Sequence, residues 1–72
     1  MNKTLYDVYP YEVEYIRGRD WYDSNSPTSW RAISGWCNMQ FEDWQYRRDS
    51  IIRGSFLFTK ESDASWFVLR WT

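Results

Sequence analysis

Aromatic side chains dominate the apolar content of this sequence, and this excess limits what the chain can fold into. Six Trp, six Tyr and four Phe residues make up 22% of the 72 residues, whereas Leu, Ile and Val together contribute only ten. Disordered segments contain few aromatic residues, so disorder does not describe the whole chain. We therefore expect one small folded domain that spans residues 1–72.

The charge balance and the short apolar runs exclude further classes of protein. Nine Lys and Arg residues against ten Asp and Glu residues give a net charge of −1. Proteins that bind duplex nucleic acid usually present a basic face, so duplex binding is not expected. The longest apolar runs, 55–58 and 66–69, are far too short to span a bilayer. No apolar segment of a secretory signal follows the first residues. We therefore expect a cytoplasmic protein that does not bind membranes.

The inventory of chemically reactive residues argues against catalysis. Cys37 is the single cysteine and there is no histidine, so a disulfide within the chain, a Cys-x-x-Cys site and histidine-based catalysis are excluded. The three glycines stand too far apart for a phosphate-binding loop. Glu42 and Asp43 form an acidic pair without a partner that would tune its pKa. We therefore expect no enzyme activity, no cofactor and no metal, and we expect Cys37 to be a core residue.

The first half of the chain predicts a strand and then a helix. Apolar and charged residues alternate over 11–17, which is typical of a half-buried strand. The pair Ser26-Pro27 is a favourable helix start, because Ser caps free N–H groups and Pro lacks one. We expect a helix over 27–40, in which Gly35 indicates close packing against a neighbour or a bend. Its core-facing stripe recurs at helical spacing: Trp30, Ile33, Cys37 and Phe41.

The second half predicts a hairpin and a further helix. Alternation over 43–48 and an aromatic-rich run over 51–59 indicate two paired strands, with Gly54 as a bulge or a displaced turn. Over 61–71 the apolar residues Ala64, Phe67, Val68 and Trp71 follow helical spacing, with Ser62 as the N-cap. The alternative for this segment is a second hairpin with 56–59.

The resulting order is β-α-β-β-α, and the predicted fold class is α+β. A three-stranded antiparallel sheet would be covered on one face by the two helices. The side chains expected to face the helices are Tyr11, Val13, Tyr15, Trp44, Tyr46, Phe56 and Phe58. The opposite face would be solvated and of mixed charge, with Glu12, Glu14, Gln45, Arg47, Ser55 and Thr59.

The C-terminal half carries a recognisable pattern. Phe56-x-Phe58, Asp63-Ala64 and Phe67-x-Leu69-Arg70-Trp71 follow a segment with Trp36-Cys37, Phe41 and Trp44. This pattern resembles short accessory proteins of tailed bacteriophages, although Glu42 stands where those proteins have Gly. The resemblance covers about half of the chain. It implies a phage accessory protein and supplies no catalytic residue.

Four aromatic residues are candidates for binding a partner. A sheet covered by two short helices can hide about ten large side chains, because each aromatic buries about 150–250 Å². Some rings must then be partly exposed, and we expect these to be Trp21, Tyr22, Trp36 and Trp66. The alternative for Trp21 and Tyr22 is that they fold back over one end of the core. Exposed apolar patches mark binding surfaces, so we expect a homodimer or a surface that receives a partner.

A second candidate site is the basic, aromatic segment around the predicted hairpin. Trp44 and Tyr46 alternate with Arg47 and precede Arg48, so these four residues could stack on and clamp a nucleotide or a single strand. The alternative is that the two aromatics pack inward, that Arg47 pairs with Glu12 or Glu14 across the sheet, and that Arg48 caps the hairpin.

These observations favour a non-enzymatic interaction protein. The leading hypothesis is a phage protein that binds a bacterial host protein and inhibits or redirects it, as an anti-defence or host-takeover factor. The alternatives are a nucleotide or single-strand binding module and a minor virion or assembly component.

Overall fold

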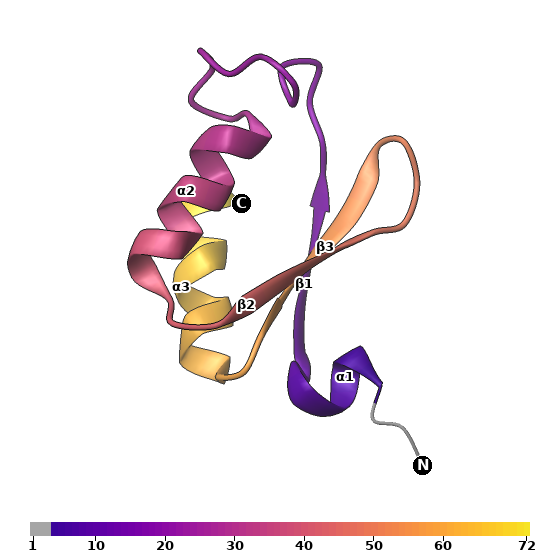
Figure 1. Cartoon of the computed structure of the whole chain (residues 1–72), viewed down its shortest axis with the longest axis vertical. Coiled ribbons are helices and arrows are strands. Elements are labelled where there is room, and N and C mark those ends of the chain that lie inside the picture. The colour runs from indigo at the N-terminus through magenta and orange to yellow at the C-terminus, as the bar shows by residue number, and fades with distance from the viewer. Residues whose placement is uncertain (1–3) are drawn as a thin grey trace.

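The computed structural model describes residues 4–72 and arranges them as three helices and one sheet (Figure 1). The elements are α1 (Leu5–Val8), β1 (Tyr11–Ile16), α2 (Trp30–Gln40), β2 (Trp44–Arg48), β3 (Arg53–Phe58) and α3 (Glu61–Trp71). The predicted α+β class and the order of the longer elements are confirmed. The last segment is a helix and not a second hairpin.

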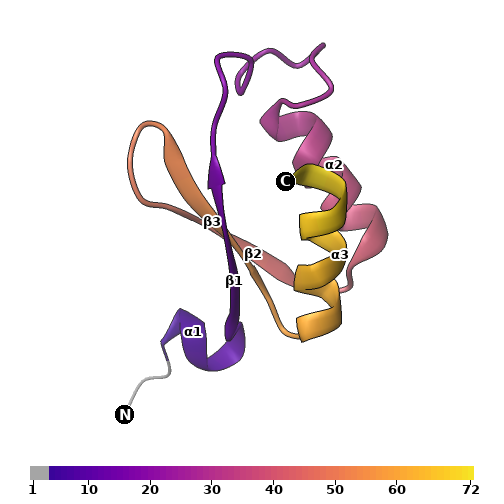
Figure 2. The ribbon, with the colours of Figure 1, turned by 180° about the vertical axis from the view of Figure 1, so that it is seen from behind.

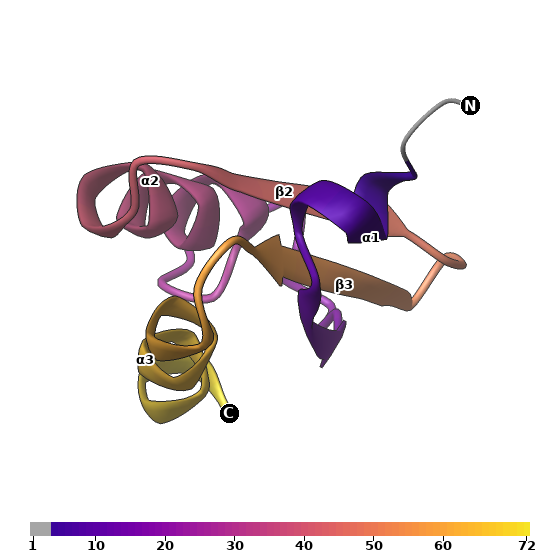
Figure 3. The ribbon, with the colours of Figure 1, turned by 90° about the horizontal axis from the view of Figure 1, so that it is seen from below.

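The sheet has the strand order β1-β3-β2, and both pairings are antiparallel. In this register Phe56 of the central strand lies between Val13 of β1 and Tyr46 of β2. Helices α2 and α3 lie on the same side of the sheet, as Figures 2 and 3 show. The predicted arrangement, one face covered by two helices, is therefore confirmed.

The one-turn helix α1 is an element that the sequence analysis did not predict. The backbone N–H of Thr4 donates to Asp7 Oδ2 at 2.9 Å, and the N–H of Tyr9 donates to the carbonyl of Leu5 at 2.9 Å. A Thr followed three residues later by an acidic residue is a helix-start signature. This signal was available in the sequence, but the turn is too short to show apolar periodicity.

Helix α2 begins later than predicted, at Trp30 and not at Pro27. The N-cap is Ser29, whose Oγ accepts a hydrogen bond from the N–H of Ala32 at 3.2 Å. Ser26, the predicted cap, belongs to the preceding turn, where its carbonyl accepts from the Ser29 hydroxyl at 2.8 Å. Both serines have suitable side chains, and the turn decides which of them caps the helix.

The bounds of β3 and α3 also differ slightly from the predictions. β3 begins at Arg53 and not at residue 51, because Asp49 and Ser50 both donate their N–H groups to the Arg53 carbonyl at 3.0 Å and close the turn. The N-cap position of α3 is occupied by Lys60 and not by Ser62.

The core is built mainly from aromatic rings and lies between the sheet and the two helices. Its centre is Phe56, whose ring centroid is 4.5 Å from that of Phe67 on α3 and 4.9 Å from that of Tyr46 on β2. Most predicted core residues are confirmed, but Tyr11 is partly exposed and Trp21 joins the core instead. The buried cluster consists of Trp21, Ile33, Cys37, Phe41, Phe56, Phe58 and Phe67.

Two glycines have roles other than those predicted. A Cβ on Gly35 would meet no atom within 4 Å, so this glycine serves no close packing, and α2 runs through it unbroken. Gly54 is no bulge, since it pairs with Tyr15 and Arg48 in regular register. A Cβ there would lie 1.9 Å from Tyr46 Oη. The absence of a side chain at Gly54 therefore makes room for the Tyr46 ring.

The face of the sheet turned away from the helices is less solvated than predicted. Ser55 and Leu57 on the central strand are buried there. The guanidinium of Arg47 lies over the Tyr6 ring at 5.0 Å from its centroid, and it pairs with Glu12 across the sheet at 3.4 Å. The expectation of a fully solvated face is wrong for Ser55, because side chains of the neighbouring strands and of α1 cover the middle of the sheet.

Candidate functional site

The structure separates the first pair of predicted partner-binding residues. Trp21 is only 5% exposed, and its ring packs against Trp30 and Tyr46 with centroids 5.5 and 5.7 Å apart. The expectation that Trp21 is partly exposed is therefore wrong, and the alternative, that it folds back over the core, holds. Tyr22 is 80% exposed, and its hydroxyl accepts a hydrogen bond from Arg17 Nη1 at 3.4 Å.

The loop before α2 holds Trp21 in this inward position. The N–H of Trp30, the first residue of the helix, donates to the Trp21 carbonyl at 2.8 Å. The carboxylate of the preceding residue, Asp20, accepts hydrogen bonds from the hydroxyls of Ser26 and Thr28. These bonds favour the charged form and lower the pKa of Asp20. These hydrogen bonds close the loop between residues 20 and 30, and the indole of Trp21 at its start is buried.

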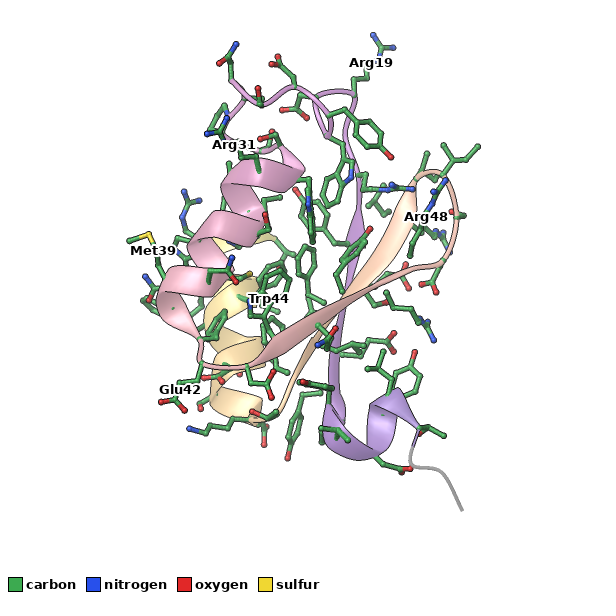
Figure 4. The ribbon with its side chains drawn as sticks, in the orientation of Figure 1. Arg19, Arg31, Met39, Glu42, Trp44 and Arg48 are labelled. Carbon is green, nitrogen blue, oxygen red and sulfur yellow. The ribbon has the colours of Figure 1, made fainter. Side chains whose placement is uncertain are left out.

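The second predicted pair forms a surface of its own, which we call the helix-pair surface: Trp36 and Met39 of α2 with Trp66 of α3. The rings of Trp36 and Trp66 are stacked, with centroids 6.5 Å apart and an interplanar angle of 28°. Trp66 is 50% exposed, and its Nε1 donates to Gln40 Oε1 at 3.3 Å. Met39 extends from α2 into solvent, as Figure 4 shows. The predicted partial exposure of Trp36 and Trp66 is confirmed.

A groove between α3 and β1, which we call the edge groove, was missed by sequence reasoning. It has a volume of about 480 Å³. Val68 shares the helical spacing of Ala64, Phe67 and Trp71, but it is 41% exposed at this groove, next to the 77% exposed Leu69. Phe67 takes the buried position because it faces the sheet directly. The lining residues are Glu12, Val13, Glu61, Ala64, Ser65, Val68 and Leu69.

A further groove lies between α2 and β2, and it contains two of the four residues predicted to bind a nucleotide. Trp44 and Tyr46 line it together with Trp30, and its volume is about 380 Å³. Trp44 Nε1 donates to Asn38 Oδ1 at 2.9 Å, which fixes the indole against the helix. These aromatics also pack inward on Phe56, as the alternative interpretation expected.

The two arginines of that predicted site do not join the aromatics. Side chains alternate along β2, so Arg47 lies on the opposite face of the sheet, where it pairs with Glu12 and with Asp49 at 2.8 Å. Arg48 lies at the hairpin turn, and its Nε donates to the Ser50 carbonyl at 3.4 Å. The structure therefore does not assemble the four residues into one clamp.

Arg17 is a buried cation whose role the sequence did not suggest. Its guanidinium lies over the Trp21 ring, 5.5 Å from the centroid, and Nη2 donates to the Ser50 carbonyl. Its backbone N–H donates to the Ile52 carbonyl at 2.7 Å. Arg17 therefore ties the end of β1 to the hairpin turn between β2 and β3.

The acidic pair and the cysteine have structural surroundings. Asp43 accepts a hydrogen bond from Tyr9 Oη at 2.7 Å, and this bond raises the pKa of the tyrosine, while Glu42 extends into solvent (Figure 4). Within residues 4–72, no three acidic or cysteine side chains stand close enough to hold a metal ion. Cys37 is fully buried, as predicted, and burial raises the pKa of its thiol to about 12.

Comparisons of the chain with protein-family models, with curated proteins and with solved structures find no match. Along residues 4–72, no helix has the length and apolar character needed to cross a membrane. The function must therefore be inferred from the surfaces described above.

Proposed function

We propose that this protein acts by binding another protein through its helix-pair surface, without chemistry of its own. One observation carries the proposal: the indole of Trp66 is stacked on that of Trp36 and yet half exposed. Trp is among the residues that contribute most to protein interfaces, and Met is also enriched there.

The area left uncovered on Trp66 is large enough to matter in binding. An aromatic side chain buries about 150–250 Å² when it is fully covered, so a half-exposed Trp leaves roughly 100 Å² for a partner to cover. At about 25 cal/mol per Å², this area corresponds to about 2.5 kcal/mol. That value is typical of a single dominant interface residue.

The position of Trp66 is fixed before any partner arrives. Its ring is held by the stack on Trp36 and by the hydrogen bond from Nε1 to Gln40. Trp36 is itself held by edge-on contacts with Phe41 and Trp71, at 5.5 and 5.8 Å between centroids. A preorganised side chain loses little conformational freedom on binding, which favours affinity.

The kind of partner that we propose rests on the resemblance of the C-terminal half to phage accessory proteins. The resemblance to phage accessory proteins favours a bacterial protein as the partner, which the bound domain would inhibit or redirect by occupying its surface. We therefore propose a host-directed binding protein of the anti-defence or takeover kind.

The test is affinity capture from bacterial lysate with Trp66→Ala beside the wild-type chain. Ile51→Ser is the matched control, because Ile51 is an exposed apolar residue outside the helix-pair surface, in the turn between β2 and β3. We expect the wild type and the control to retain one host protein at near-stoichiometric level, and Trp66→Ala to weaken binding of the purified partner by about 50-fold. If no host protein is retained, or if Trp66→Ala retains it equally well, the proposal is wrong.

A second candidate function is supported by the groove of Trp30, Trp44 and Tyr46, since aromatic rings are the platforms on which bases stack. Titration of tryptophan fluorescence with nucleotides, cyclic dinucleotides and oligonucleotides tests it. Saturable quenching that Trp44→Leu abolishes would favour this function over protein binding. The third candidate, a virion or assembly component, predicts that mass spectrometry detects the chain in purified particles.

A further inference from the structure

Strand β1 forms one edge of the sheet. It pairs with β3 alone, and the central position of β3 leaves the other side of β1 without a neighbouring strand among residues 4–72. The N–H of Arg17 points toward the hairpin, where it donates to Ile52. Because backbone groups alternate along an antiparallel strand, those of Glu12, Glu14 and Ile16 point away from β3. They are available to pair with an added strand.

The edge groove runs beside this open edge and is apolar on the side of the helices. Val13 of β1 forms its floor, and Val68 and Leu69 of α3 form its wall. Its volume of about 480 Å³ leaves room for several side chains. A strand added to β1 would place every second side chain on the same face as Val13, in contact with this groove.

The alternate side chains of an added strand would meet negative charge. Glu12 and Glu14 lie on the opposite face of β1. Glu12 is already paired with Arg47 at 3.4 Å, whereas the Glu14 side chain is 58% exposed and has a long contact of 3.9 Å to Arg53, so Glu14 is the main attraction for a basic side chain. Glu61 adds a third carboxylate at the rim of the groove. The edge therefore selects for Lys or Arg at the positions that flank the apolar ones.

A second copy of the chain does not satisfy this pattern. If two β1 strands paired antiparallel about Val13, Glu12 of one copy would lie opposite Glu14 of the other. Directly opposed like charges destabilise a strand pair, and charged side chains at an open edge are a common means of preventing self-association. A partner strand with basic side chains at these positions pairs with the carboxylates and avoids this repulsion, which favours a different protein as the occupant.

We propose that the outer edge of β1 and the edge groove bind an extended segment of a partner protein in which apolar residues alternate with Lys or Arg. Peptides commonly bind in this way, with main-chain hydrogen bonds supplying affinity and alternate side-chain contacts supplying specificity. This site lies on the other flank of α3 from the stacked Trp36 and Trp66. The proposal for this site is therefore independent of the function proposed for the helix-pair surface.

The probe for the test is the synthetic peptide acetyl-Lys-Val-Lys-Val-Lys-Val-Lys-amide, and binding to the full chain is followed by calorimetry. Its acidic counterpart, with Glu in place of Lys, is the charge control. Two further versions carry N-methyl groups on alternate amides. One blocks the peptide edge that would face β1, and the other blocks the outer edge. We expect the basic peptide and the version methylated on its outer edge to bind, and the other two to bind at least about tenfold more weakly.

Variants locate the site on the protein. Leu69→Ser removes an exposed apolar side chain of the groove and is expected to weaken binding about tenfold, while Glu14→Gln weakens it about twofold to fivefold. Trp66→Ala and Ile51→Ser are expected to leave it unchanged. Bound peptide should also slow hydrogen exchange at the amides of Glu12 and Glu14, which a contact with side chains alone would not do.

Several outcomes would overturn the proposal. The proposal is wrong if the basic peptide shows no binding at millimolar concentration or if the acidic peptide binds equally well. Strand addition is excluded if both methylation patterns weaken peptide binding equally, or if bound peptide does not slow hydrogen exchange at the amides of Glu12 and Glu14. If neither peptide binds, the carboxylates of β1 serve only to keep the edge unpaired.

Discussion

Replacing Gly54 by Ala is expected to destabilise the protein, even though alanine is ordinarily more favourable than glycine within a folded element. The new Cβ would lie 1.9 Å from Tyr46 Oη and 2.3 Å from its Cζ. The Tyr46 ring cannot move aside cheaply, because its centroid is 4.9 Å from those of both Trp30 and Phe56. Either the central strand or the aromatic core must shift.

The expected magnitude follows from two opposing contributions. Overpacking a close-packed core costs about 1–3 kcal/mol, whereas the loss of backbone freedom in the unfolded chain returns about 0.4–1 kcal/mol. The net destabilisation is about 1–2 kcal/mol, which lowers Tm by about 5–15 °C in a domain of this size.

Gly35→Ala is the matched control, because it makes the same chemical change where the structure leaves open space. In a helix interior this change stabilises by about 0.5–1 kcal/mol. The assays are urea denaturation followed by tryptophan fluorescence and thermal unfolding followed by far-UV circular dichroism. If Gly54→Ala is as stable as the wild type while Gly35→Ala is stabilised, the Tyr46 ring does not exclude a side chain at position 54, and the reasoning is wrong.

Four further measurements test other features. Tyr46→Phe is expected to leave the free energy of unfolding unchanged or raised by up to about 1 kcal/mol, because the buried hydroxyl makes no hydrogen bond; a loss above 1 kcal/mol in urea would contradict this. Cys37 should resist alkylation at pH 8 until the protein unfolds, since its pKa of about 12 keeps the buried thiol protonated; fast labelling of the native chain would refute its burial. The lowered pKa of Asp20 stabilises the fold at pH values above its unfolded pKa of about 4, and this stabilisation is lost as the pH falls through the folded pKa. The free energy of unfolding of Asp20→Asn should therefore decline less in acid than that of the wild type. An identical decline would contradict the role of Asp20. Static light scattering at micromolar concentration should detect a dimer if the helix-pair surface pairs with itself, and a monomer whose fluorescence iodide does not quench would contradict the exposure of Trp66.

Apolar periodicity predicted the regular elements well, because a half-buried strand or helix repeats the same environment along its length. The alternation over β1 and the helical stripe from Trp30 to Phe41 both identified the side of each element that faces the core. The helical spacing over 61–71 contains both Phe67 and Val68, but only Phe67 is buried. Two adjacent helical residues cannot both face the sheet, and Phe67 takes the buried position.

The features that depend on distant residues could not be predicted in this way. Trp21 lies in a polar loop, and its burial results from contacts with Trp30 and Tyr46 and from a hydrogen bond to the first turn of α2. The role of Gly54 depends on where the Tyr46 ring lies across the strand pair. The edge groove likewise exists only because α3 crosses beside an open edge of the sheet. None of these leaves a local pattern in the sequence.

The position of β3 at the centre of the sheet has a consequence for synthesis on the ribosome. Strand β1 leaves the ribosome before β3, which among residues 4–72 is its only partner strand and begins at Arg53. Until β3 emerges neither side of β1 has a strand to pair with, and α3, whose Phe67 packs on Phe56, emerges later still. Pairings between segments so distant in sequence also form slowly. A chain truncated before β3, at residue 52, therefore lacks the strand with which β1 and β2 both pair, and its exposed first strand becomes a substrate for chaperones and proteases.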